Sequence, residues 1–288
     1  MQVRAGEVML EVDDRGPRDG EPVLLIMGLG MQLVAWPEAL VDDLVARGHR
    51  VIRFDNRDAG LSQGFDERGV PNLAVAALRW WLRLPVHAPY SLADMAADAL
   101  ALLDVLGIAR ARVCGASMGG MIAQHLAARH PDRVSRLILM MTSSGARRLP
   151  QARPQVRRAL LARPKGQGAD AAVAYLEHLF HLIGSPGHRP DPALLHERLR
   201  ASVERAWRPA GTARQLCAVA SDGDRTPLLR RIVAPTTVIH GRDDPLIPAI
   251  CGEDLARHIH GARLELLPGM GHDLPDALLP RLAELIAG

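Results

Sequence analysis

Short apolar runs alternate with helical patterns along the first half of the chain. Helical spacing of apolar residues appears at 37–47 and 120–129, and a capping box of Ser91 and Asp94 opens a helix that runs to Leu106. Buried strands rich in Val, Ile and Leu that are separated by helices are typical of a mostly parallel sheet covered on both faces. Five apolar runs predict these strands, at residues 7–12, 23–27, 49–55, 112–114 and 136–141.

The alternation stops at about residue 143. From there to about residue 232 the pattern is helical, with Pro- and Gly-rich interruptions such as ARPKGQG and GSPGHRPDP. Strand patterns return at 236–240 and 263–267, and the sheet needs these strands to be complete. The sequence therefore predicts an α/β core of residues 1–142 and 233–288 with an inserted helical cap of residues 143–232.

The stretch GASMG, residues 115–119, places a serine between a predicted strand and a predicted helix. Small residues on both sides permit a sharp turn, which projects the serine Oγ above the sheet and beside the positive end of the helix. This context predicts that Ser117 is a nucleophile. The alternative is a glycine-rich linker that carries an ordinary surface serine.

A nucleophilic serine needs a base, and the base needs an acid to orient it. Among the twelve histidines, His272 alone combines a loop after a late strand with a flanking glycine, and we expect it to be the base. We expect Asp244 to be the acid, because Pro245 restricts its backbone and adjacent side chains point in different directions. Asp243 is then a loop carboxylate, and His240 holds the same loop in place.

The oxyanion of a tetrahedral intermediate needs two backbone N–H donors. Met118, directly after the serine, is expected to supply one at the start of the helix. Leu29 in the loop Met27–Gly30 is expected to supply the other, although a plain turn with two glycines fits the same spacing. Residues 55–58 are expected to organise a turn beneath this site, with Arg57 bonding nearby carbonyls or carboxylates.

Composition limits the remaining function classes. The net charge is +3, and no aromatic residues interleave with the basic ones, so nucleic-acid binding gains no support. No apolar stretch approaches a membrane span and the N-terminal residues lack a signal-peptide core, so we expect a cytoplasmic protein with free cysteines. No spaced ligand cluster or phosphate loop indicates a metal or an organic cofactor. Homo-oligomerisation is left open.

Four motifs in this order resemble the α/β-hydrolase family over essentially the whole chain: MGLG, FDNRDAGLS, GASMGG, then HGRDDPLIP before GMGH. FDNRDAGLS with the following PNLAVAALRWWLRLP most resembles bacterial esterases related to aclacinomycin methylesterase. The resemblance implies an oxyanion hole at Leu29 and Met118 and an acid at Asp244. Met27 stands where relatives usually carry histidine, and Ser117 argues against the dehalogenases, which have aspartate there.

These residues together predict a serine hydrolase that cleaves carboxylic esters through an acyl-enzyme on Ser117. Lactone hydrolysis and cofactor-free perhydrolysis can use the same residues, and a non-enzymatic ligand-binding scaffold is a third alternative. Trp80 and Trp81 are expected to line an apolar substrate pocket or else to pack the cap. Arginines of the cap are expected on the solvent face, so the predicted substrate is a small, uncharged, apolar ester.

Overall fold

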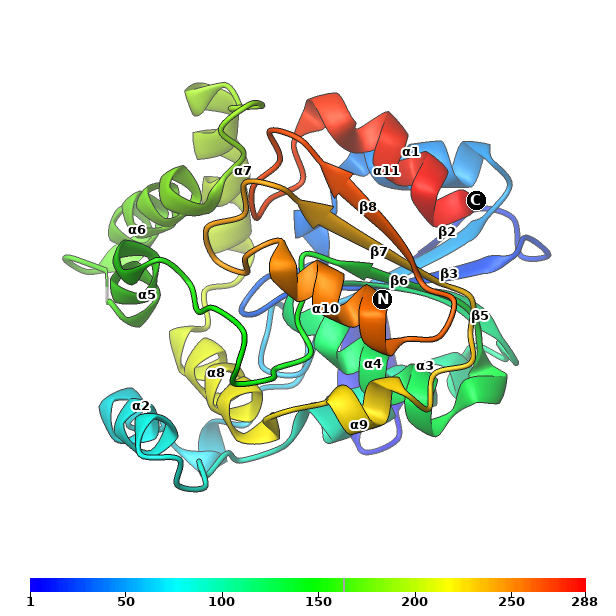
Figure 1. The fold of residues 1–288 in the computed structure, drawn as a ribbon. Helices are drawn as coiled ribbons and strands as arrows, with labels where there is room; N and C mark the ends of the chain where they lie inside the picture. The colour runs from blue at the N-terminus through cyan, green and yellow to red at the C-terminus, as the bar shows by residue number, and fades with distance from the viewer. Residues whose placement is uncertain (163) are drawn as a thin grey trace.

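An eight-stranded sheet lies at the centre of the computed structural model, which describes residues 1–162 and 164–288 (Figure 1). The strand order is β1-β2-β4-β3-β5-β6-β7-β8. The strands from β4 to β8 in this order pair in parallel, whereas β1 and β2 are antiparallel to their neighbours. The bounds are β1 Gln2–Ala5, β2 Val8–Arg15, β3 Pro22–Ile26, β4 Arg50–Phe54, β5 Ala111–Ala116, β6 Val134–Met140, β7 Thr236–Gly241 and β8 Arg263–Leu267. The predicted α/β class with a mostly parallel sheet is confirmed.

Helices cover both faces of the sheet, as the apolar strand pattern predicted. Helices α1 (Glu38–Ala46) and α11 (Leu279–Ala287) pack on one face, and α3 (Leu92–Val105), α4 (Met118–Arg129) and α10 (Ile250–His258) pack on the other. Strand β3 shows the division residue by residue. Its Val23 and Leu25 belong to the core beside α1, and its Leu24 and Ile26 belong to the core beside α4, because successive strand side chains point to opposite faces.

One strand was missed and one strand end differs by three residues, whereas the other strand ends lie within two residues of the prediction. Strand β1 was not predicted, because four residues at a sheet edge with alternate side chains exposed carry little pattern of their own. Strand β2 continues to Arg15, beyond the predicted end at residue 12, because its last residues pair with β4. In both cases the segment is a strand because it pairs with a neighbouring strand, which the local sequence does not reveal.

We call residues 143–232, between β6 and β7, the cap region. Its described residues form five helices: α5 (Pro154–Leu161), α6 (Gly168–Ile183), α7 (Pro192–Arg205), α8 (Pro209–Asp222) and α9 (Thr226–Leu229). Figure 1 shows α5 to α8 beyond the carboxyl ends of β7 and β8, with α2 (Leu73–Trp81) beside α8. Short 3-10 turns occur at Leu33–Ala35, Asp66–Arg68, Pro131–Arg133 and Asp276–Leu278. No helix in the described part of the chain is both long enough and apolar enough to cross a membrane.

Candidate active site

Ser117 occupies a strained turn between β5 and α4. Its backbone φ is +56° and its ψ is −118°, a conformation that a residue with a side chain adopts only when its surroundings impose it. Two hydrogen bonds impose it here. The Ser117 N–H donates to the Met140 carbonyl at 2.9 Å, and the Thr142 hydroxyl donates to the Ser117 carbonyl at 2.7 Å. The turn therefore presents the Ser117 side chain at the carboxyl edge of the sheet.

Gly119 allows α4 to begin against β3. A Cβ atom at this position would stand 2.0 Å from the carbonyl oxygen of Ile26, closer than any side chain could be accommodated. The start of α4 therefore lies directly over the end of β3, and only glycine permits this approach.

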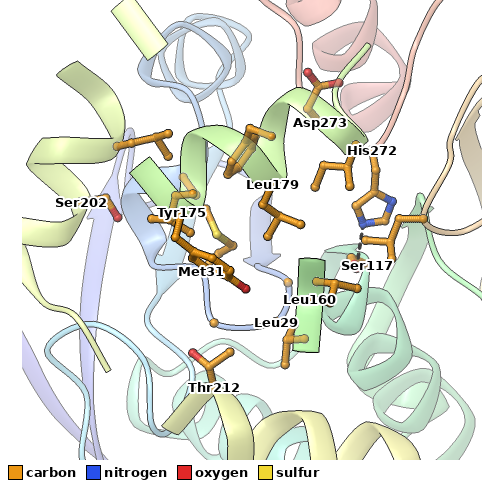
Figure 2. A pocket seen from close by; sticks show the side chains of 18 of the residues that line it. Leu29, Met31, Ser117, Leu160, Tyr175, Leu179, Ser202, Thr212, His272 and Asp273 are labelled. Atoms are coloured by element: carbon orange, nitrogen blue, oxygen red, sulfur yellow. Dashed lines mark hydrogen bonds between the residues drawn. The ribbon is translucent and has the colours of Figure 1, made fainter. Parts of the chain in front are cut away.

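A chain of hydrogen bonds joins Ser117, His272 and Asp244, which come from three separate loops. Figure 2 shows the contact between Ser117 and His272. His272 Nε2 lies 3.0 Å from Ser117 Oγ, and His272 Nδ1 lies 2.6 Å from Asp244 Oδ2. Asp244 Oδ1 accepts the backbone N–H groups of Leu246 and Ile247, both at 2.8 Å. An ionised carboxylate only accepts hydrogen bonds, so this contact fits the tautomer with the proton on Nδ1 and the lone pair of Nε2 toward Ser117 Oγ.

Of the two adjacent aspartates, Asp244 is the one that reaches the imidazole. Asp243 is exposed and accepts the Gly269 N–H at 2.9 Å. His240 lies behind Asp244 and donates from Nε2 to the carbonyl of Ile247 at 2.8 Å, which holds the loop as expected. Burial lowers the pKa of His240, so this second histidine stays neutral beside the carboxylate.

Two residues that line the cavity with Ser117 carry backbone N–H groups without an acceptor in the described protein. Leu29 and Met118 both line the cavity in front of Ser117, and within the described residues neither donates its N–H to an acceptor in the protein. Gly28 brings the loop close, since a Cβ there would be 3.1 Å from the Ser117 Cβ. Both expected donors therefore lie at the cavity that contains Ser117.

Residues 55–58 form a buried turn beneath this loop, as the sequence predicted. Asn56 donates to the Met27 carbonyl at 2.9 Å, which ties the turn to the Leu29 loop. Arg57 makes two hydrogen bonds of 2.6 Å to Asp98 on α3. Burial alone would raise the pKa of Asp58, but hydrogen bonds, that of Arg214 first among them, lower it. The turn is a buried ionic support rather than a second reactive centre.

Some cap arginines are buried, which corrects the expectation that they face solvent. Arg214 on α8 donates to Asp58 at 2.7 and 2.8 Å, and Arg225 donates to Asp222 and to Gln124. Both guanidinium groups are paired, so the physical argument against an unpaired buried charge still holds.

Gln215 supports the Leu29 loop and was not identified from the sequence. Its side chain is fully buried, its Oε1 accepts the Gly30 N–H at 2.8 Å, and its Nε2 donates to the Arg57 carbonyl at 2.8 Å. Gln215 thus joins the loop to the buried turn. A single glutamine within a helix has no local signal that would reveal this role.

A cavity of about 2610 Å³ opens in front of Ser117 and His272. This exceeds the roughly 300–1,000 Å³ of ordinary small-molecule pockets. Figure 2 shows Ser117 and His272 together at one side, with Tyr175, Met31 and Ser202 across the cavity. Most of the lining is apolar and comes from the Leu29 loop and the cap region, including Met31, Leu160, Tyr175, Leu176, Leu179, Phe180, Leu199 and Leu216. The exposed Arg157, Arg189 and Arg198 lie along the same lining.

Asp273 adds a carboxyl group to the cavity beside His272 (Figure 2), and no local pattern in the sequence pointed to this residue. Its Oδ1 accepts hydrogen bonds from the backbone N–H and the hydroxyl of Ser185. Burial raises the pKa of Asp273 above its ordinary value despite these bonds.

Trp80 and Trp81 do not line the cavity, and this prediction is wrong. Neither side chain is among the described residues around the cavity, whereas Val70 to Ala74, which precede them, are. Trp81 is 72% exposed, and Trp80 lies beneath the guanidinium of Arg147. The residues before α2 and at its start line the cavity, whereas the two tryptophans at its end do not.

Comparison with known proteins identifies the family. The model of the alpha/beta hydrolase fold family matches residues 21–276, and the chain therefore belongs to that family. Rhodomycin D methylesterase DnrP of Streptomyces peucetius is 30% identical over 97% of this chain and 94% of its own. The 3-oxoadipate enol-lactonase 2 of Acinetobacter baylyi is 29% identical over 91% of this chain and 89% of its own. A solved hydrolase from Pseudomonas aeruginosa PA01, 28% identical, covers 100% of this chain and 98% of its own with a TM-score of 0.71.

Proposed function

We propose that the protein hydrolyses the carboxylic ester of a bulky, apolar acid through an acyl-enzyme on Ser117. The hydrogen-bonded chain from Ser117 through His272 to Asp244 is the observation that carries the proposal. Membership of the α/β hydrolase fold family and the methylesterase relatives support a carboxylic-ester hydrolase, as the sequence predicted.

In the first half of the reaction, Ser117 Oγ attacks the ester carbonyl carbon while its proton moves to His272 Nε2. The Asp244 carboxylate stabilises the imidazolium that forms. The N–H groups of Leu29 and Met118 donate to the oxyanion, a role that backbone donors beside a nucleophilic serine commonly have. The tetrahedral intermediate then collapses, the bond to the alcohol oxygen breaks, and the alcohol leaves with the proton from His272.

In the second half, His272 takes a proton from water as the water oxygen attacks the acyl carbon. The bond to Ser117 Oγ breaks, the proton on His272 returns to the serine, and the free acid leaves. Every proton that His272 accepts is handed on, so no further reactant is needed.

The cavity supports a large acyl group. Its volume of about 2610 Å³ and its apolar lining favour a substrate with an extensive apolar body. The methylesterase relatives favour a small alcohol, so the proposed substrate is the methyl ester of such an acid. Lactone hydrolysis is the second candidate, because an enol-lactonase is among the relatives and a lactone is an internal ester.

The test of the acyl-enzyme is a stopped-flow burst of p-nitrophenol from p-nitrophenyl butyrate, followed by mass spectrometry of the acylated peptide. The acyl group is expected on Ser117, and Ser117→Ala should lower turnover by about 10⁴- to 10⁶-fold. Ser221→Ala, at an exposed serine on α8, serves as the control. Turnover of Ser117→Ala within tenfold of the parent would refute the assignment.

The substrate class is tested with a matched panel. Methyl esters of acids with one to four fused rings should show kcat/KM rising with apolar size, because a larger acyl group fills more of the cavity. Lactones, and peroxide-dependent halogenation, are assayed in parallel. A preference for lactones would favour the second candidate, and no turnover of any of these would leave the scaffold interpretation.

A further inference from the structure

Helix α2 is almost wholly apolar and has no buried residue. Eight of its nine residues, LAVAALRWW, are apolar. Val75 is 50% exposed, Leu78 is 55% exposed and Trp81 is 72% exposed. Single exposed apolar side chains are ordinary on protein surfaces, but a helix composed of them is a sign of an interaction surface.

The exposed apolar side chains gather on one side of the helix. Val75, Leu78 and Leu82 follow one another at helical spacings of three and four, which places them on one face. Trp81 lies beside that face, and Leu84, which follows the end of the helix, is 46% exposed. The other side of α2 packs against α8, so the exposed face has no partner within the described protein.

The charges around this face favour an anionic surface. Residues 70–90 contain Arg79, Arg83 and His87 and no Asp or Glu. The acidic residues that precede the segment are already partnered, Asp66 with Arg214 and Glu67 with Arg68. A second copy of this chain meeting the face symmetrically would oppose arginines with arginines, whereas an anionic lipid surface pairs with them.

Tryptophan and arginine bordering an apolar helical face are typical of helices that lie in a lipid–water interface. We propose that α2 rests on a lipid surface that carries anionic headgroups, with its apolar face in the acyl boundary and Arg79 and Arg83 at headgroup level. The contact is peripheral, since the helix has only nine residues.

The position of α2 relates this contact to the cavity. Val70, Pro71 and Leu73, at the start of the same segment, line the cavity that contains Ser117. If the substrate is an apolar ester, which rests on the proposed function, it concentrates in lipid and meets the cavity from the side on which α2 lies. Lipid binding itself requires only the surface, so it can be tested apart from catalysis.

The experiment measures co-sedimentation of the full chain with vesicles of phosphatidylcholine alone or mixed with phosphatidylglycerol. Binding is expected to the mixed vesicles and to fall with added salt. Leu78→Gln with Trp81→Gln should remove binding. Arg79→Gln with Arg83→Gln should weaken it by about thirtyfold, since each basic residue near an anionic surface contributes roughly fivefold.

Val233→Gln is the matched control, because Val233 is 75% exposed and lies away from α2 in the sequence. No binding to either vesicle, or equal loss in Val233→Gln, would overturn the proposal. The proposal would also be overturned if the protein bound no vesicles but dimerised with rising concentration, and if Leu78→Gln with Trp81→Gln abolished that dimerisation. A second copy would then cover the face. Ser117→Ala should bind vesicles normally, which separates failure of the lipid contact from failure of the proposed hydrolysis.

Discussion

Replacing Asp244 by asparagine tests whether the Asp244 carboxylate fixes the tautomer of His272. The asparagine carbonyl can still accept the N–H groups of Leu246 and Ile247, which donate to Oδ1 at 2.8 Å. Its NH₂ group then faces His272 Nδ1, which sits 2.6 Å from Oδ2 in the parent. Two donors cannot share this contact, so the imidazole takes the tautomer with its proton on Nε2 and can no longer accept the Ser117 proton. Loss of the correct tautomer lowers kcat by about 10⁴-fold in a serine enzyme, or about 5.4 kcal/mol at roughly 1.36 kcal/mol per tenfold.

The assay is steady-state ester hydrolysis by Asp244→Asn and Asp243→Asn, with circular dichroism to verify that both variants fold. Asp243→Asn is the matched control, because its exposed carboxylate accepts from the Gly269 N–H and from no other donor among the described residues. It should keep kcat within about threefold of the parent, as a surface substitution away from the reacting groups. Equal losses in the two variants, or a loss below tenfold in Asp244→Asn, would refute the assigned role of Asp244.

Three further substitutions test the supports of the site. Gly119→Ala should destabilise the fold by about 3 kcal/mol or more, because its Cβ would meet a backbone carbonyl at 2.0 Å. Denaturant unfolding measures this loss of stability, and an unchanged unfolding midpoint would contradict the prediction. Gln215→Leu removes the acceptor of the Gly30 N–H and should lower kcat by about ten- to hundredfold, because the Leu29 loop would be misplaced. An unchanged kcat in steady-state kinetics would disprove this prediction. Asp273 has a raised pKa, so the native state loses stability as pH rises from the ordinary carboxyl pKa of 3.8 through the raised value. Asp273→Asn should therefore melt higher than the parent at pH 8, with the gap closing toward pH 4, and a gap independent of pH would contradict this.

Local sequence patterns were sufficient for seven of the eight strands and for the turn at Ser117. Apolar runs predicted strands because a parallel strand is buried on both faces, and the GASMG stretch predicted a sharp turn because small residues alone permit one. Asp244 could be preferred to Asp243 from the restriction that Pro245 imposes. In each case the physical cause acts within a few residues, so the sequence contains it.

Contacts between distant segments could not be predicted in the same way. Gln215 supports Gly30 across 185 residues, and only the docking of α8 over the Leu29 loop brings them together. Trp80 and Trp81 were expected to line the pocket, yet they do not, because only the residues before α2 and at its start reach the cavity.

Within residues 270–273, one residue of the site was predicted from the sequence and its neighbour was not. Glycine and histidine in a loop after a late strand marked His272, but nothing in the sequence distinguished the neighbouring Asp273. Its place in the cavity and its raised pKa arise from burial beside Ser185, contributed by the loop after α6. The sequence determined the elements and the reactive residue types, because backbone geometry and side-chain chemistry are local. The tertiary structure alone decided which side chains share the cavity and how burial alters their charges, because both depend on segments that meet only after folding.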